Sequence, residues 1–169
     1  MDLKSLTTQM TMHAGAIHSL TLGISTQQAR WKPDPKAWSI LEVINHLFDE
    51  EREDFRVRLD YILHHPARPW PPINPQGWVT ERGYNQRDLA QSVDDFLKER
   101  QKSLAWLKGL EKPDWQASVT VSFGNYSAGD ILAAWAAHDL LHLRQLVELH
   151  WAILLQAAEP YKVEYAGEW

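Results

Sequence analysis

Four stretches of the chain repeat apolar residues at intervals of three and four, the spacing that gives an α-helix one apolar face. The first covers residues 3–22 and the last covers residues 128–157. Two more, 39–63 and 88–109, lie between them, so the pattern predicts four amphipathic helices. We therefore expect an all-α protein built as a four-helix bundle, with a single domain over residues 1–169.

Capping signals mark the starts of two of these helices. The segment Ser39–Glu42 has the S-x-x-E form of a capping box, in which two side chains satisfy free N–H groups at a helix start. The segment Ser127–Asp130 has the related form with an aspartate in the fourth position. Both signals agree with the starts that the periodicity predicts.

The connections between the helices are long. Residues 66–85 are rich in proline and lack a periodic pattern. About twenty extended residues can cover more than the roughly 38 Å of a 25-residue helix, so this crossover allows the third helix to run parallel to the second. Residues 111–127 include the alternating run Val119–Phe123, closed by Gly124-Asn125, which favours a brief hairpin or extended strand. We expect both connections to border the opening of a site.

Composition narrows the classes of function. The chain has no cysteine, which excludes a thiol nucleophile, a thiolate metal site and disulfides. Its net charge of −5 and the lack of a basic stripe argue against nucleic acid as a partner. It shows no signal peptide and no run of about 20 apolar residues that could cross a bilayer. We expect a cytoplasmic protein that acts on a small molecule.

The strongest chemical signal is a pair of histidines one helical turn apart. His138 and His142 share the core-facing stripe of the last helix with Trp135 and Gln145. Buried imidazoles need hydrogen-bond partners or a metal ion, and one ion would satisfy both. His46, at the edge of the apolar face of the second helix, is the candidate for a third ligand.

Three imidazoles with an open fourth position are typical of a catalytic zinc site, and nickel, cobalt or iron would also accept them. A di-iron site is disfavoured, because none of the three histidines has a glutamate three residues before it. The run His138–His142 also resembles the H-E-x-x-H motif of zinc proteases. A protease is discounted because Asp139 is one methylene shorter than the required glutamate.

Other polar residues have weaker claims. Glu50, one turn after His46, is the best candidate for a fourth ligand or general base, but a solvated charge in the acidic run 49–51 is the preferred interpretation. Gln145 could hydrogen-bond a metal-bound water or serve only as a good helix former. Asp139 is interpreted as a surface charge, with contact to a ligand histidine as the alternative. The remaining histidines are assigned packing roles; they are His13, His18, His64, His65 and His150.

Two motifs resemble those of one known family. The segment Trp38–Leu47 and the later segment His138–Leu146 are similar to the paired motifs of the DinB/YfiT-like family, and the helix pattern matches along nearly the whole chain. The resemblance implies a bundle with a crossed helix order, a divalent metal on His46, His138 and His142, and frequent homodimers. It also implies metal-dependent transferases and isomerases that use bacillithiol or mycothiol, or metal-dependent hydrolases.

Two classes of function therefore remain. In the first, the protein is an enzyme whose metal, zinc or nickel, activates a bound water or a low-molecular-weight thiol for S-transfer or hydrolysis. In the second, it is a stress-associated metal-binding or interaction module without catalytic activity. The open coordination position favours the enzyme.

Overall fold

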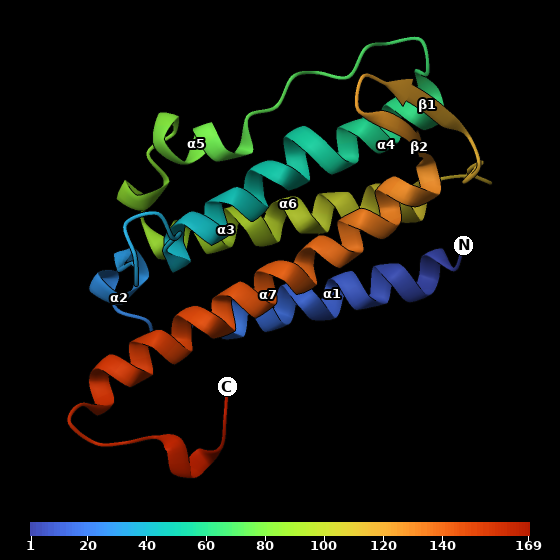
Figure 1. Cartoon of the computed structure of the whole chain (residues 1–169). Helices are drawn as coiled ribbons and strands as arrows, with labels where there is room; N and C mark the ends of the chain where they lie inside the picture. The colour runs from blue at the N-terminus through green and yellow to red at the C-terminus, as the bar shows by residue number, and fades with distance from the viewer.

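Four long helices form the body of the molecule, as the computed structural model of residues 1–169 shows (Figure 1). The four-helix bundle predicted from the sequence is confirmed. Its long helical elements are α1 (Leu3–Ser19), α3 (Ile40–Asp49) continued by η1 (Glu50–Phe55) and α4 (Arg56–His64), α6 (Leu89–Gly109) and α7 (Ala128–Ala158). The shorter elements are α2 (Thr26–Arg30), α5 (Pro75–Glu81), η2 (Tyr84–Gln86), β1 (Ser118–Val121), β2 (Gly124–Ser127) and η3 (Glu164–Ala166).

The helices have a crossed order. Figure 1 shows α6 running beside α3 and α4 in the same direction, while α1 and α7 run together in the opposite direction. The parallel orientation of the second and third long helices agrees with the length of the proline-rich crossover, which carries the chain back along the bundle. The first and last helices are therefore direct neighbours.

The second long helix contains an irregularity that the sequence pattern does not indicate. Residues 39–63 were expected to form one regular helix, whereas the residues from Glu50 to Phe55 form a π-helix. A π-helical turn is wider than an α-helical turn and is found most often at functional sites. This turn begins one helical turn after His46 and carries the buried acidic side chains of Glu50, Glu51 and Asp54.

The crossover is more ordered than the sequence suggested. Residues 66–85, expected to have no regular structure, contain the short helix α5 and the beginning of η2. The side chain of Asn74 caps α5 by accepting a hydrogen bond from the N–H of Gly77, and Pro75 occupies the first turn, where a missing N–H costs nothing. Arg82 and Tyr84 both bond to Asp49, which ties this segment to α3.

The expected hairpin is present in residues 111–127. Strands β1 and β2 pair antiparallel, with Val119 opposite Tyr126 and Thr120 opposite Asn125. Gly124 begins the second strand, so the turn lies at Ser122-Phe123, two residues earlier than the expected Gly124-Asn125. Trp70 of the crossover packs near Phe123 and Tyr126, which fixes the hairpin at the end of α4.

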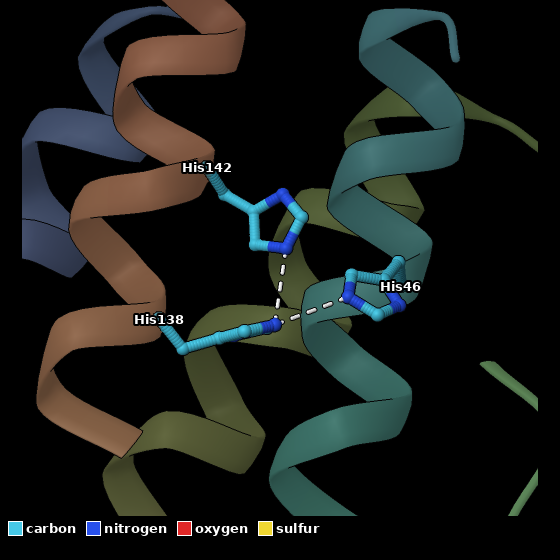
Figure 2. A group of neighbouring side chains, drawn as sticks. All are labelled: His46, His138 and His142. Atoms are coloured by element: carbon cyan, nitrogen blue, oxygen red, sulfur yellow. Dashed lines mark hydrogen bonds between the residues drawn. The ribbon is translucent and has the colours of Figure 1, made fainter. Parts of the chain in front are cut away.

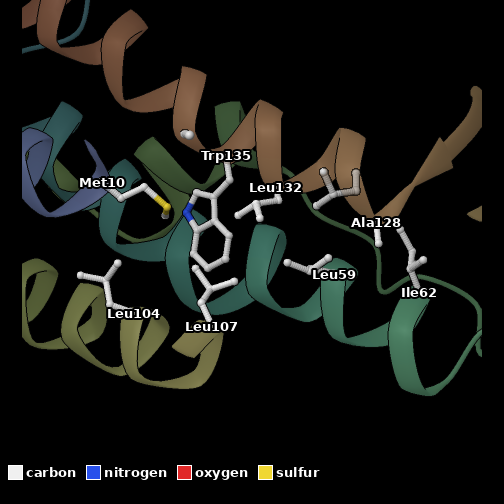
Figure 3. Close-up of a cluster of buried hydrophobic side chains, with 10 residues drawn as sticks. Met10, Leu59, Ile62, Leu104, Leu107, Ala128, Leu132 and Trp135 are labelled. Carbon is white, nitrogen blue, oxygen red and sulfur yellow. The ribbon is translucent and has the colours of Figure 1, made fainter. Parts of the chain in front are cut away.

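Two apolar clusters form the core, one towards each end of the bundle. Figure 3 shows the cluster at the hairpin end, to which all four long helical elements contribute, for example through Met10, Leu59, Leu104 and Leu132. The second cluster includes Ile17, Ile44, Phe96 and Leu146. Buried polar side chains of three of the long helical elements lie between the two clusters, among them Glu51, Arg100, Asp139 and His142. His46 is buried beside Leu47 of the second cluster. None of the helices combines the length and apolar character that a membrane span requires.

Candidate metal centre

The three histidines singled out in the sequence lie together. His46 comes from α3, whereas His138 and His142 come from successive turns of α7, and Figure 2 shows their rings turned toward one another between the two helices. Their ligand atoms all lie within 4.8 Å of one another. The fold thus brings His46 beside side chains that are more than ninety residues away in sequence.

The spacing of the nitrogen atoms fits a single metal ion. Nε2 of His138 lies 3.2 Å from Nε2 of His46 and 3.1 Å from Nε2 of His142. Nitrogen ligands at about 2.05 Å from a tetrahedral metal ion are separated by about 3.3 Å. Both separations therefore need little adjustment to accept an ion.

The start of α3 is fixed firmly two turns before His46. The predicted capping box is complete, because the Ser39 hydroxyl accepts from the N–H of Glu42 and the Glu42 carboxylate accepts from the N–H of Ser39. The same hydroxyl donates to Oδ1 of Asn85 over 2.7 Å. This contact links the helix start to η2, so the backbone that carries His46 is held from outside the helix as well.

Gln145 lies beside an imidazole ring. Its Oε1 is 2.8 Å from Nδ1 of His142. An amide oxygen can only accept a hydrogen bond, so this contact puts the ring proton on Nδ1 and leaves a lone pair on Nε2. The arrangement presents Nε2 of His142 in the form that binds a metal ion.

Glu50 lies beside His46 on the side away from the other histidines. Its Oε1 is 3.8 Å from Nδ1 of His46, and neither atom has a hydrogen-bond partner. Its side chain also lines the cavity described below. Burial and the neighbouring Asp54 carboxyl raise the pKa of Glu50 to about 8. This carboxyl group can therefore hold a proton near neutral pH.

Burial keeps the three imidazoles neutral. Removal from water, together with the neighbouring His142, lowers the pKa of His46 to about 3 and that of His138 to about 2. Burial also lowers the pKa of His142. Neutral imidazoles are the form that coordinates metal ions, so the environment of the cluster favours a ligand role.

Aromatic side chains hold the rings in place. The Trp38 indole lies parallel to the His142 ring, with their centroids 6.2 Å apart, and its centroid is 4.8 Å from that of His46. On the other side, the centroid of Phe55 lies 5.0 Å from that of His138. Trp38 is therefore both a packing partner of the histidines and part of the wall of the neighbouring cavity.

A cavity of about 690 Å³ lies beside the histidines. The three rings form part of its wall, and the charged side chains of Lys36, Arg144 and Glu148 also contribute. Of the two connections expected to border the site, the crossover contributes Pro75 and Gln76. The expectation for residues 111–127 is wrong, because the hairpin packs at the far end of α4 and contributes no side chain to the cavity.

The interpretation of Asp139 as a surface charge is also wrong. Its side chain is fully buried and forms two hydrogen bonds with the guanidinium group of Arg100, both of 2.7 Å. Arg100 also bonds to Glu51. The sequence analysis identified neither Arg100 nor Glu51 as an interior residue. The one available signal was that Arg100 falls at the spacing of the apolar residues of α6, and this spacing alone does not show that an arginine is buried.

The other histidines do not join the cluster. His150 is 2.6 Å from the carbonyl oxygen of Leu20, and His13 lies 3.4 Å from Asp139. His64 and His65 lie near Asp60 at the exposed end of α4. The one group of at least three metal-ligating side chains that is close enough for a shared ion is formed by His46, His138 and His142.

Comparison with known proteins identifies relatives of this fold. Residues 9–146 match the model of the DinB superfamily. No curated protein matches the chain. Among solved structures, YfiT from Bacillus subtilis superposes with a TM-score of 0.77 at 13% sequence identity, covering 87% of this chain and 85% of that one. YfiT is described as "a probable metal-dependent hydrolase with an unusual four-helix bundle topology".

Proposed function

The chain belongs to the DinB superfamily, and from this premise we propose that it is a metal-dependent enzyme whose His46, His138 and His142 hold one divalent ion. The observation that carries the proposal is the convergence of three neutral imidazoles on one point beside an open cavity. Three such ligands leave a coordination position free for a reactant, as in catalytic zinc sites. Zn²⁺ or Ni²⁺ suits a ligand set made only of imidazoles.

The proposed reaction is transfer of a low-molecular-weight thiol to an electrophilic small molecule. A divalent ion in this site supplies Lewis-acid activation, which brings the pKa of a small nucleophile close to neutral. The chain has no cysteine, so a nucleophilic sulfur must come from a second molecule, for which a thiol of the bacillithiol or mycothiol type is suited. The sulfur loses its proton, forms a bond to carbon, and displaces the leaving group.

The side chains around the histidines have separate roles in this proposal. Glu50, whose side chain lines the cavity and whose Oε1 has no hydrogen-bond partner, is the group that accepts the proton when it is ionised, a form that its raised pKa favours above about pH 8. Gln145 positions His142 through the bond to Nδ1. Trp38 forms an aromatic wall against which an apolar part of a substrate can pack.

Hydrolysis is the second candidate reaction. The description of the similar B. subtilis protein as "a probable metal-dependent hydrolase" favours it. Water would then replace the thiol as nucleophile, and the same carboxyl group would accept its proton. A metal-binding module without catalytic activity needs no cavity beside its ions, so the cavity favours an enzyme over that alternative.

Elemental analysis of the purified protein, followed by assays of the metal-loaded form, tests the proposal. The assays would measure conjugation of bacillithiol or mycothiol to a model electrophile, and hydrolysis of a model ester. We expect one divalent ion per chain, and thiol conjugation that is lost in His46→Ala. Hydrolysis without conjugation would move the function to the second candidate. Absence of metal from the protein, even after incubation with Zn²⁺ or Ni²⁺, would overturn the site itself.

We also propose that the protein forms a homodimer through α7. The outer face of this helix carries exposed apolar side chains at helical spacing, including Leu140 at 54%, Val147 at 39% and Leu154 at 52% exposure. Their seven-residue intervals place them in one stripe along the helix. A second copy of α7 could cover this stripe in a symmetric interface.

A further inference from the structure

We propose that Arg100 is a positioning residue that sets the separation of the two helices carrying the three histidines. The proposal rests on the metal-binding function above. Arg100 belongs to α6 and is only 2% exposed. Its Nε donates to Glu51 over 2.8 Å, and its two terminal nitrogens donate to the two carboxylate oxygens of Asp139 over 2.7 Å.

The two carboxylates come from the two helices that carry the histidines. Glu51 lies five residues after His46 on the same continuous helix, and Asp139 directly follows His138 on α7. A single guanidinium group therefore connects one histidine-bearing helix to the other. The helices also meet directly, because Nε1 of Trp135 donates to the same Glu51 oxygen over 2.7 Å.

The remaining helix joins the same network. A terminal nitrogen of Arg100 donates to the backbone carbonyl of Met10 in α1 over 3.0 Å. The contacts of Arg100 therefore involve all four long helical elements. They lie at the level where the two apolar clusters are interrupted, which is also the level of the histidines along α3 and α7.

The chemistry of these contacts suits a positioning role. The hydrophobic effect is non-directional, so the burial of apolar side chains does not by itself fix how neighbouring helices are placed along or around one another. A planar guanidinium paired with a carboxylate at two points has a fixed geometry. Buried ion pairs are often no more stabilising than apolar residues of similar volume. Geometric definition of the helix spacing is therefore the better explanation of this network.

The π-helical turn gives Glu50 and Glu51 different tasks. Both side chains are at least nine-tenths buried although they are consecutive. Glu50 lies beside His46 and the cavity, whereas Glu51 bonds to Arg100 and Trp135. Because the turn is wider here, Glu50 can lie beside the candidate metal centre while the next residue, Glu51, bonds to Arg100.

A second ion pair provides a matched control. Arg56 of α4 pairs with Glu99 of α6 and donates to the Ser103 hydroxyl over 3.1 Å. This contact also connects α6 to the helix that carries His46, but it involves no residue of α7 and contributes nothing to the histidine cavity. Its loss should weaken the bundle without changing the separation of the histidines.

Titration with Co²⁺ tests the proposal on purified wild-type protein, Arg100→Met and Arg56→Met. The readouts are the dissociation constant, the visible absorption spectrum of the bound ion, and thermal unfolding in the presence of a chelator. We expect Arg100→Met to bind Co²⁺ at least about 10-fold more weakly, with an altered spectrum, as is typical when groups that orient metal ligands are lost. Arg56→Met should lower the melting temperature while keeping the wild-type affinity and spectrum.

Two outcomes in the variants would overturn the positioning role while leaving the metal site in place. The first is an Arg100→Met protein that binds Co²⁺ with wild-type affinity and spectrum. If that variant does not fold, Trp135→Phe provides the test, because it keeps an aromatic ring and removes the hydrogen bond to Glu51. Unchanged Co²⁺ binding by Trp135→Phe would then be the second outcome that overturns the positioning role. A wild-type protein that does not bind Co²⁺ would overturn the metal site and the positioning role together, which distinguishes the two failures.

Discussion

Nδ1 of His142 donates a hydrogen bond to Oε1 of Gln145, three residues further along α7. The bond fixes the orientation of the ring and the position of its proton at once. It leaves Nε2, the atom that faces His138, free to bind a metal ion. Gln145, for which the sequence left open a contact to a metal-bound water or a role as a helix former, thus contacts the imidazole.

Loss of this hydrogen bond should weaken metal binding. We predict that Gln145→Met, which keeps the length of the side chain, lowers the affinity for Zn²⁺ by about 10- to 100-fold. Competition with a chromophoric chelator measures the affinity. Gln156→Met, on an exposed position of the same helix, is the control and should bind Zn²⁺ as the wild type does. Equal affinities in all three proteins would assign Gln145 to the helix surface alone.

Removal of one histidine should abolish tight metal binding without unfolding the bundle. We predict that His142→Ala retains most of its helix content by circular dichroism but contains no stoichiometric metal. Chelation should lower the melting temperature of the wild type only. An ion present at 1,000 times its dissociation constant stabilises the folded state by about 4 kcal/mol. Unchanged metal stoichiometry in the variant would contradict the assignment of the three ligands.

The two capping serines should differ in their contribution to stability. Ser39→Ala removes a helix cap and the hydrogen bond to Asn85, whereas Ser127→Ala removes a cap that is largely exposed. We predict a loss of about 1 kcal/mol of unfolding free energy for Ser127→Ala and about 2 kcal/mol for Ser39→Ala. Urea denaturation of the metal-free proteins measures both. A larger loss for Ser127→Ala would argue against the link between α3 and η2.

A charge on the outer face of α7 should separate the proposed dimer. We predict that Leu140→Glu shifts the protein from dimer to monomer in sedimentation equilibrium, because the symmetric interface would bring two carboxylates into an apolar contact. Leu22→Glu introduces the same charge at an exposed leucine outside α7 and should leave the dimer intact. A monomeric wild type would refute the interface.

The fold and the histidine cluster could be predicted because most of their signals are local in the sequence, and because two separate motifs point to the same cluster. The spacing of apolar residues defines each long helix, and His138 and His142 are neighbours through helix geometry alone. The third histidine of the cluster, His46, is distant in sequence and was identified from the motif that surrounds it. The length of the crossover allowed α6 to run parallel to α3 and α4, as Figure 1 shows that it does.

The network around Arg100 could not be predicted in the same way. Asp139 was assigned to the surface because α7 was expected to bury one stripe, but α7 packs against α1 as well as α4, so more than one of its faces is covered. Arg100 and Asp139 are far apart in sequence, and no periodic pattern pairs them. The π-helical turn was missed because the same apolar residues fit a regular helix over most of their length.

The pairing of α1 with α7 has a consequence for synthesis of the protein. The ribosome synthesises the chain from the N-terminus, so α1 emerges first. It cannot pack against α7 until this last long helix has been translated. Two of the three imidazoles arrive with that same helix. A nascent chain that ends before α7 therefore holds only His46 of the three, so the candidate metal centre cannot assemble before the bundle closes.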